Sequence, residues 1–92
     1  MSNKGTAILN FGSAPGTNMV ITTVTGEAGI LSGSAADAFI MANSTATHNS
    51  YEHSIVPIIL RCGNIVPGIG FDIIATSELR LTGTFLVNWV WA

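Results

Sequence analysis

The most informative pattern of side chains lies near the end of the chain, between Leu79 and Ala92. Large apolar side chains occupy alternate positions there, at Phe85, Val87, Trp89 and Trp91. Leu86 and Val90 occupy the intervening positions, so both sets are apolar. Because successive side chains of a strand point to opposite faces, this segment predicts a strand that is apolar on both faces. Such a strand lies between two packed layers or beneath a neighbouring subunit.

The other apolar residues form short runs rich in Ile, Val, Thr and Phe, separated by clusters of Gly, Pro, Asn or Ser. This pattern is typical of strands and turns. The runs that predict strands are Thr6–Phe11, Asn18–Thr25, Ser54–Cys62 and Phe71–Ala75. Turns are predicted at Gly12–Gly16, Gly63–Gly70 and Thr76–Glu78. Pro57 restricts its run to a sheet edge, a strand end or a bulge.

Two segments in the middle of the chain carry weaker signals. Between Gly29 and Asn43 a single helical turn and a further strand fit equally well. The segment Ala42–His53 holds no aliphatic residue larger than Ala and is predicted to be the longest loop. With no helical crossover, the pattern predicts an all-β fold, a small antiparallel β-sandwich of the jelly-roll-like kind. It spans residues 1–92 as one domain, with residues 1–11 as an N-terminal arm or an edge strand.

The composition is poor in charge. Hydrophobic residues make up 48% of the chain, and only 9% of residues are charged, against about 25% in an average soluble domain. The three basic residues, Lys4, Arg61 and Arg80, are too few and too scattered to neutralise a run of phosphates, so nucleic-acid binding is not expected. The surface is therefore expected to be covered by Ser, Thr, Asn and Gly, by other subunits, or by both.

Membrane insertion and export are not expected either. Every apolar stretch is shorter than the roughly 20 residues that span a bilayer as a helix. Lys4 is followed by an interrupted segment instead of a continuous apolar run, so we expect the chain to begin as a mature intracellular product. Cys62 is the one cysteine and is expected to act as a small buried hydrophobe.

The predicted long loop holds the densest group of functional side chains. His48, Glu52 and His53 are the candidates for a metal site, because imidazole and carboxylate groups suit zinc and similar ions. A separation of five residues between the two histidines argues against it, since it places them on opposite faces of a strand. The alternative is a loop held by hydrogen bonds from His, Thr and Glu to its own backbone, and we favour it.

No enzyme motif accompanies this loop. Ser50 lies near both histidines but lacks the Gly-x-Ser-x-Gly turn that exposes a nucleophile. The carboxylates are spread along the chain, and Gly68-Ile69-Gly70 lacks the third glycine of a dinucleotide-binding turn. We therefore predict that the chain is not an enzyme and binds no cofactor.

The two tryptophans allow two interpretations. Trp89 and Trp91 could stack on a sugar beside the polar loop, which would make the chain a carbohydrate- or receptor-binding module. Alternate aromatic residues in a strand are more often core or interface anchors. We therefore predict that core and interface contacts are made by Phe85, Leu86, Val87, Trp89 and Trp91.

A set of short motifs resembles a group of small, mostly uncharacterised phage-encoded proteins. The motifs are Phe11-Gly12, Pro15-Gly16, Val24-Thr25-Gly26, Thr45 with His48, Glu52 and His53, Gly68-x-Gly70-Phe71, and Trp89-Val90-Trp91. Thr47 and Tyr51 stand where this resemblance leads us to expect acidic residues, which weakens a metal or acid–base role for the loop. The resemblance implies a phage-structural context.

Composition and resemblance together favour a subunit that works by being packed into an assembly. The leading hypothesis is a phage virion structural protein, made in the host cytoplasm and located in the virion. Within that class we expect a capsid decoration or cement protein, bound as a trimer over the lattice of the major capsid protein. A tail or connector component is the nearest alternative.

Overall fold

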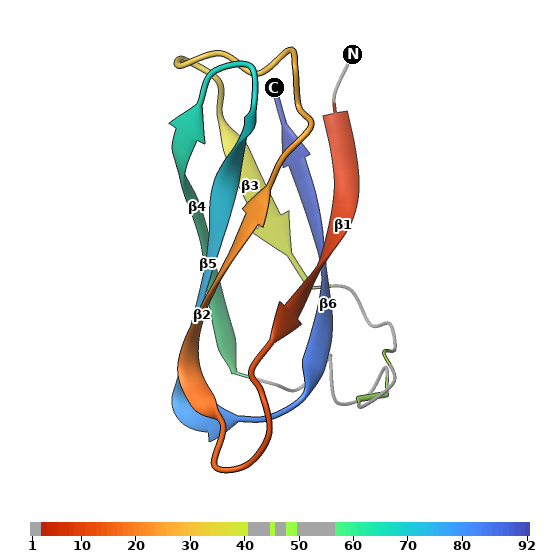
Figure 1. Ribbon diagram of the computed structural model, residues 1–92, viewed down its shortest axis with the longest axis vertical. Helices are drawn as coiled ribbons and strands as arrows, with labels where there is room; N and C mark the ends of the chain where they lie inside the picture. The colour runs from red at the N-terminus through yellow and green to blue at the C-terminus, as the bar shows by residue number, and fades with distance from the viewer. Residues whose placement is uncertain (1–2, 41–44, 46–47, 50–56) are drawn as a thin grey trace.

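Six strands form two three-stranded antiparallel sheets (Figure 1). The computed structural model describes residues 3–40, 45, 48–49 and 57–92. The strands are β1 (Asn3–Asn10), β2 (Thr17–Val24), β3 (Ala36–Phe39), β4 (Ile58–Val66), β5 (Gly70–Leu81) and β6 (Thr84–Trp91). The strand orders are β1-β6-β3 and β2-β5-β4. The predicted all-β sandwich is confirmed.

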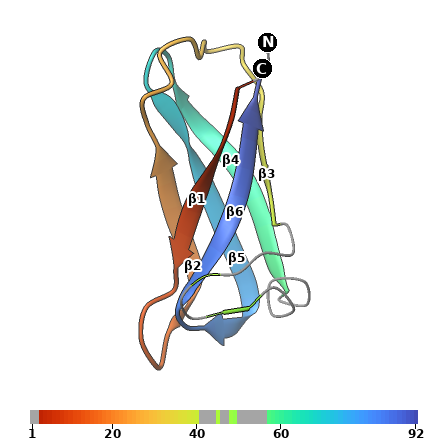
Figure 2. The ribbon, with the colours of Figure 1, turned by 90° about the vertical axis from the view of Figure 1, so that its right-hand side faces the viewer.

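The two sheets face each other, with β1-β6-β3 nearest the viewer in Figure 2. Every connection changes sheets except the turn between β4 and β5, and β1 pairs with β6 while β2 pairs with β5. This is the wrapping of a jelly-roll-like sandwich. At one side of the sandwich, the hydroxyl of Thr22 donates a hydrogen bond of 3.3 Å to the backbone oxygen of Ile8, which links the edge strands β2 and β1.

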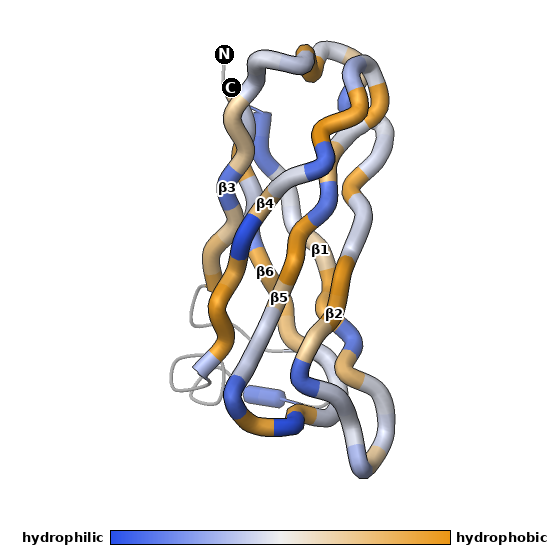
Figure 3. Tube along the Cα trace, turned by 90° about the vertical axis from the view of Figure 1, so that its left-hand side faces the viewer, coloured by the Kyte–Doolittle hydropathy of each residue, from blue (hydrophilic) through white to orange (hydrophobic). Residues whose placement is uncertain are grey.

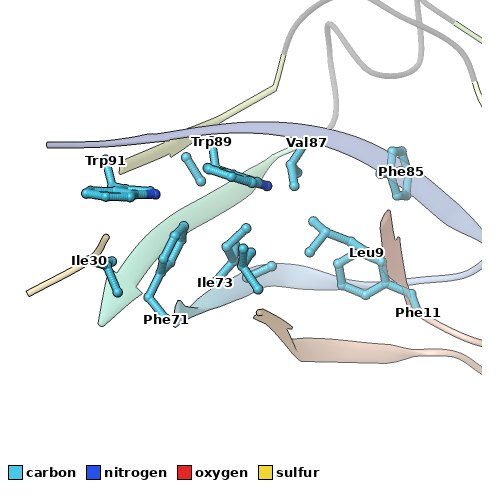
Figure 4. Close-up of a cluster of buried hydrophobic side chains, with 12 residues drawn as sticks. Leu9, Phe11, Ile30, Phe71, Ile73, Phe85, Val87, Trp89 and Trp91 are labelled. Atoms are coloured by element: carbon cyan, nitrogen blue, oxygen red, sulfur yellow. The ribbon is translucent and has the colours of Figure 1, made fainter. Parts of the chain in front are cut away.

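The core lies between the sheets. Its buried apolar residues are Leu9, Phe11, Val24, Ile30, Ala38, Phe71, Ile73, Ala75, Phe85, Val87, Trp89 and Trp91. Figure 4 shows the side chains of β6 pointing toward those of β5. An edge-to-face ring pair between Phe71 on β5 and Trp89 on β6, with centroids 5.6 Å apart, joins the two layers. A second such pair, Phe11 and Phe85 with centroids 5.8 Å apart, packs beside it at the end of β1 and the start of β6. Of the two apolar faces predicted for the last strand, the one that carries Phe85, Val87, Trp89 and Trp91 is buried between the sheets.

Small residues on both neighbouring strands leave room for the side chain of Trp89. In the sheet Trp89 pairs with Gly5 on β1 and with Ala38 on β3. A Cβ atom added at Gly5 would overlap the indole ring. The ambiguous segment between Gly29 and Asn43 thus contains a strand, Ala36–Phe39, whose small inward residues make room for the large rings of β6.

The prediction of a turn at Thr76–Glu78 was wrong. These residues lie within β5, where Thr76 pairs with both Met19 and Ile59. Thr and Ser are compatible with a strand, so their polarity marks a change of environment along β5 and does not end it. The turn lies at Thr82 and Gly83, and the φ of 77° at Gly83 is a conformation that favours glycine.

The predicted turn at Gly63–Gly70 is shorter than expected, because β4 continues to Val66. The pairing of β4 with β5 is irregular between Gly63 and Val66, as in a β-bulge. Asn64, within this irregular stretch, has a φ of 53°. Pro57 directly precedes β4, an edge strand, in agreement with the restriction that proline imposes. At the N-terminus, Asn3–Asn10 pairs with β6 along its whole length as an edge strand.

Candidate functional site

His48 is anchored to the turn between β5 and β6. Its Nε2 lies 2.6 Å from the backbone oxygen of Thr82, and its ring stacks on Phe85 with centroids 4.0 Å apart and 13° between the planes. Thr45 adds a hydrogen bond of 2.7 Å from its hydroxyl to the backbone oxygen of Thr84. His and Thr side chains thus tie the described part of the polar loop to backbone carbonyls, mainly those of the neighbouring turn.

This anchoring changes what His48 offers to a metal ion. A carbonyl oxygen only accepts hydrogen bonds, so Nε2 must carry the proton and has no lone pair for a metal. The other two candidates, Glu52 and His53, lie outside the described residues. Among the residues that the structure describes, no three His, Cys, Asp or Glu side chains are grouped to hold a metal ion.

Four of the five predicted interface residues are buried within this one chain. Phe85, Val87, Trp89 and Trp91 point between the sheets, and the two tryptophans are only 7% and 8% exposed. Their rings therefore offer no open face to a sugar. Leu86 points to the outer side of the sheet and is half-buried. A contact between subunits needs residues that the alternation of β6 did not single out.

Cys62 lies on β4, partly buried against the core. Burial, with a smaller contribution from the Asp37 carboxylate, raises the pKa of its thiol above the ordinary value of 9.0. A raised pKa leaves less thiolate at neutral pH, so the group is a poor nucleophile. The sequence predicted a small buried hydrophobe, and the structure places the thiol against the core but only partly buried.

The most exposed apolar surface of a sheet lies on the outer side of β2-β5-β4 (Figure 3). We call this surface the Ile21 face and define it by six outward residues: Met19, Ile21, Ile59, Arg61, Ile74 and Thr76. Its three most exposed apolar side chains, at Met19, Ile21 and Ile59, are 52%, 51% and 55% exposed. The run Asn18–Thr25 did not reveal this face, because after Asn18 both of its alternating sets are apolar or Thr and either set could face the core.

A polar row borders the Ile21 face. Asp72 accepts hydrogen bonds from the Thr23 hydroxyl, at 2.7 Å, and from Nδ2 of Asn64, at 3.1 Å. Gly63 pairs with Asp72 and Arg61 pairs with Ile74, so Arg61 stands one row away from this carboxylate on the neighbouring strand. Within the described part of the chain, Arg61 forms no hydrogen bond or ion pair, so its guanidinium is open to a partner.

The opposite sheet carries a second apolar surface. A hollow of about 450 Å³ opens on the outer side of β1-β6-β3, with Phe39, 42% exposed, on one wall and Lys4 and Thr6 on another. Nδ2 of Asn88, another lining residue, is buried and has no hydrogen-bond partner among the residues that the structure describes.

Comparisons of the chain with protein-family models, with curated proteins and with solved structures gave no match. In the described ranges, no helix is long and apolar enough to cross a membrane. The interpretation of function therefore depends on the surfaces described above.

Proposed function

We propose that this chain is a structural subunit of a phage virion that acts by assembly, as a capsid decoration or cement protein. The observation that supports the proposal is the exposed apolar surface on the outer sides of both sheets, in a chain with eight charged side chains. Large exposed apolar surfaces of this kind are typical of interaction sites. The partners are further copies of the chain and other virion proteins, such as the major capsid protein.

Burial of these residues supplies the free energy of assembly. Full burial of a large aliphatic side chain is worth roughly 1.5–3 kcal/mol, and Met19, Ile21 and Ile59 keep about half of their surface exposed in the single chain. Each therefore has on the order of 1 kcal/mol left to contribute to a contact. Symmetry multiplies such contacts without new sequence, as in the trimer expected for a decoration protein.

The tryptophan platform of a carbohydrate-binding module finds no support. Trp89 and Trp91 are buried, and the Nε1 of Trp91 donates a hydrogen bond of 2.8 Å to Glu27. The chain has no further tryptophan that could form such a platform. Assembly is therefore the function that the exposed surfaces favour.

Location in the particle tests the proposal. Virions purified from the native source would be separated into heads and tails, and each fraction would be probed with antibody against the purified chain. Many copies in the head fraction support a decoration protein, and signal in the tail fraction replaces it with the tail or connector alternative. Absence from purified particles would overturn the virion proposal. Light scattering after size-exclusion chromatography gives the oligomeric state, for which we expect a trimer or a multiple of it.

A further inference from the structure

The outer side of β1-β6-β3 carries one positive and one negative side chain in the same row. Lys4 on β1 and Asp37 on β3 both pair with Val90 on β6, so they stand on either side of it, each one strand spacing of about 4.8 Å away. Oδ1 of Asp37 accepts a hydrogen bond of 2.9 Å from the backbone N–H of Ala38. Within the described residues, Lys4 forms no ion pair, so both charges are open to a partner.

The rest of this surface is a hollow with an exposed ring beside it. We call the surface, which faces the viewer in Figure 2, the Asn88 face. Its outward residues are Lys4, Thr6, Ile8, Asp37, Phe39, Leu86, Asn88 and Val90. Thr6 and Phe39 both pair with Asn88 and flank it, and all three line the hollow of about 450 Å³. The ring of Phe39 is 42% exposed and stands at the side of a space that nothing in the single chain fills.

We infer that the Asn88 face binds the Asn88 face of a second copy of this chain, around a two-fold axis parallel to β6. Rotation about that axis lays β6 on β6, and β1 of each copy on β3 of the other, at the same level. Lys4 then meets Asp37 of the second copy, and the symmetry forms this ion pair twice. The inference rests on the proposed assembly function and deepens it by naming one surface and its partner.

The residues that lie on the axis are compatible with their own copies. Val90 meets Val90 and Leu86 meets Leu86, which are apolar contacts. Asn88 meets Asn88, and because an amide carries both donor and acceptor groups, the two side chains can bond each other reciprocally once they rotate about their terminal bonds. Phe39 of each copy lies over Thr6 of the other, at the hollow, where its ring gains apolar contact.

The two charges favour this axis over the other two-fold axis that keeps the strands aligned. An axis across the strands lays β1 on β1 and β3 on β3 at every level, so Lys4 never meets Asp37. At the level of Val90 it places Lys4 on Lys4 and Asp37 on Asp37. Because these two are the charged residues among the eight of the face, the axis parallel to β6 creates no contact between like charges.

The contact is small. Eight residues of each copy take part, compared with about 20–30 on each side of a standard interface, so we expect a weak dimer that dissociates on dilution. Because a two-fold contact closes with two copies, it gives a dimer, or joins two trimers that are built through other surfaces.

The first test is the mass in solution over a series of concentrations, measured by light scattering for wild type and two variants. Phe39→Glu replaces the exposed ring with a carboxylate and is expected to halve the mass at concentrations where wild type is paired. Leu31→Glu changes a side chain that is 67% exposed in the loop between β2 and β3, away from the face, and is expected to leave the mass unchanged. A wild-type mass that is an odd multiple of the chain at every concentration, or a mass unaffected by Phe39→Glu, would overturn the inference. Thermal unfolding of each variant verifies that it folds.

The second test uses charge complementation between two copies. Lys4→Glu and Asp37→Lys each place like charges together twice in the proposed dimer, so each is expected to lower the mass. An equimolar mixture is expected to restore it, because the new carboxylate at position 4 of one variant then faces the new ammonium at position 37 of the other, and the native pair faces each other at the second contact. A mixture that stays at the lower mass would contradict the intermolecular pair. If Asp37→Lys does not fold, Asp37→Asn removes the charge alone, keeps an oxygen for the N–H of Ala38, and is expected to lower the mass less than Lys4→Glu.

These measurements also separate the inference from the proposed function. A dimeric chain that responds to Phe39→Glu but is absent from purified virions supports the face-to-face contact and overturns the virion proposal. A chain that is abundant in virions but stays monomeric in solution and on the particle overturns the contact and leaves the virion proposal in place.

Discussion

The indole Nε1 of Trp91 donates a hydrogen bond of 2.8 Å to Oε1 of Glu27, so the last residue of β6 is tied to the loop that follows β2. The ring of Trp91 also lies over Gly29, where an added Cβ would come 3.3 Å from the ring carbon Cη2. The end of the sandwich near the chain termini is thus closed by an aromatic ring that contacts residues more than 60 positions away in the sequence.

Removing the acceptor at position 27 tests this closure. Glu27→Ala leaves the mostly buried indole N–H without its partner, and we expect the free energy of unfolding to fall by about 1–3 kcal/mol. Glu27→Gln keeps an oxygen in the same place and should lose less. Urea unfolding followed by tryptophan fluorescence measures both. Equal stabilities of Glu27→Ala and wild type would show that water replaces the carboxylate at no cost.

The packing of Trp89 over Gly5 gives a second prediction. Gly5→Ala adds a methyl group where the indole ring lies, and the forced displacement is expected to lower the free energy of unfolding by about 1–3 kcal/mol. Gly33→Ala is the matched control, since nothing lies within 4 Å of a Cβ at that position, and its effect should be within about 0.5 kcal/mol. A larger loss from Gly33→Ala than from Gly5→Ala would contradict the placement of the ring.

The thiol of Cys62 predicts a pH dependence of stability. Burial, together with Asp37, raises the pKa of Cys62 in the folded chain above its ordinary value of 9.0. The folded state therefore favours the neutral thiol, and this contribution is complete below pH 9 and is lost as the pH rises through the folded pKa. Wild type should lose more stability than Cys62→Ala when urea unfolding is repeated above pH 9. Parallel losses in the two proteins would indicate other groups.

The hydrogen bond from His48 to Thr82 fixes a tautomer. The neutral ring should carry its proton on Nε2, because the backbone oxygen of Thr82 can only accept. Long-range ¹H–¹⁵N correlation spectra of the histidine side chains distinguish this form from the Nδ1–H form. His48→Ala removes the matching signals and so assigns them. If the neutral ring carried its proton on Nδ1 instead, the anchoring of the loop through His48 would be contradicted.

The strands that sequence alone predicted well are those with a run of β-branched and aromatic residues between clear turn residues. In β6 the alternation placed Phe85, Val87, Trp89 and Trp91 on one face, and these four side chains are buried. It did not decide between the two faces, and Leu86, which was grouped with them, lies on the outer side. The runs at β1 and β2 also agree with the structure to within a few residues. The local sequence pattern is sufficient to predict a strand where the residue type and the burial of the side chain change together along the chain.

The remaining strand boundaries depend on pairing with neighbouring strands of the same sheet. Ala36–Phe39 has weak strand propensity, and it forms β3 because Ala36 and Ala38 fit beside Trp91 and Trp89. Likewise, Thr76 and Ser77 continue β5 because strands on both sides pair with it there. The Ile21 face was missed for the same reason, since the choice of outward residues in β2 depends on the register with β5.

The pairing of Asn3 with Trp91 determines how the fold would respond to a mechanical load. The two ends of the described chain lie side by side at one end of the sandwich, in the antiparallel neighbours β1 and β6 (Figure 1). Force that pulls these ends apart loads the hydrogen bonds between β1 and β6 one after another, starting at Asn3 and Trp91, so the two strands separate sequentially. A subunit held in an assembly through its sheet faces, with its ends free of tension, is never loaded in this weak direction.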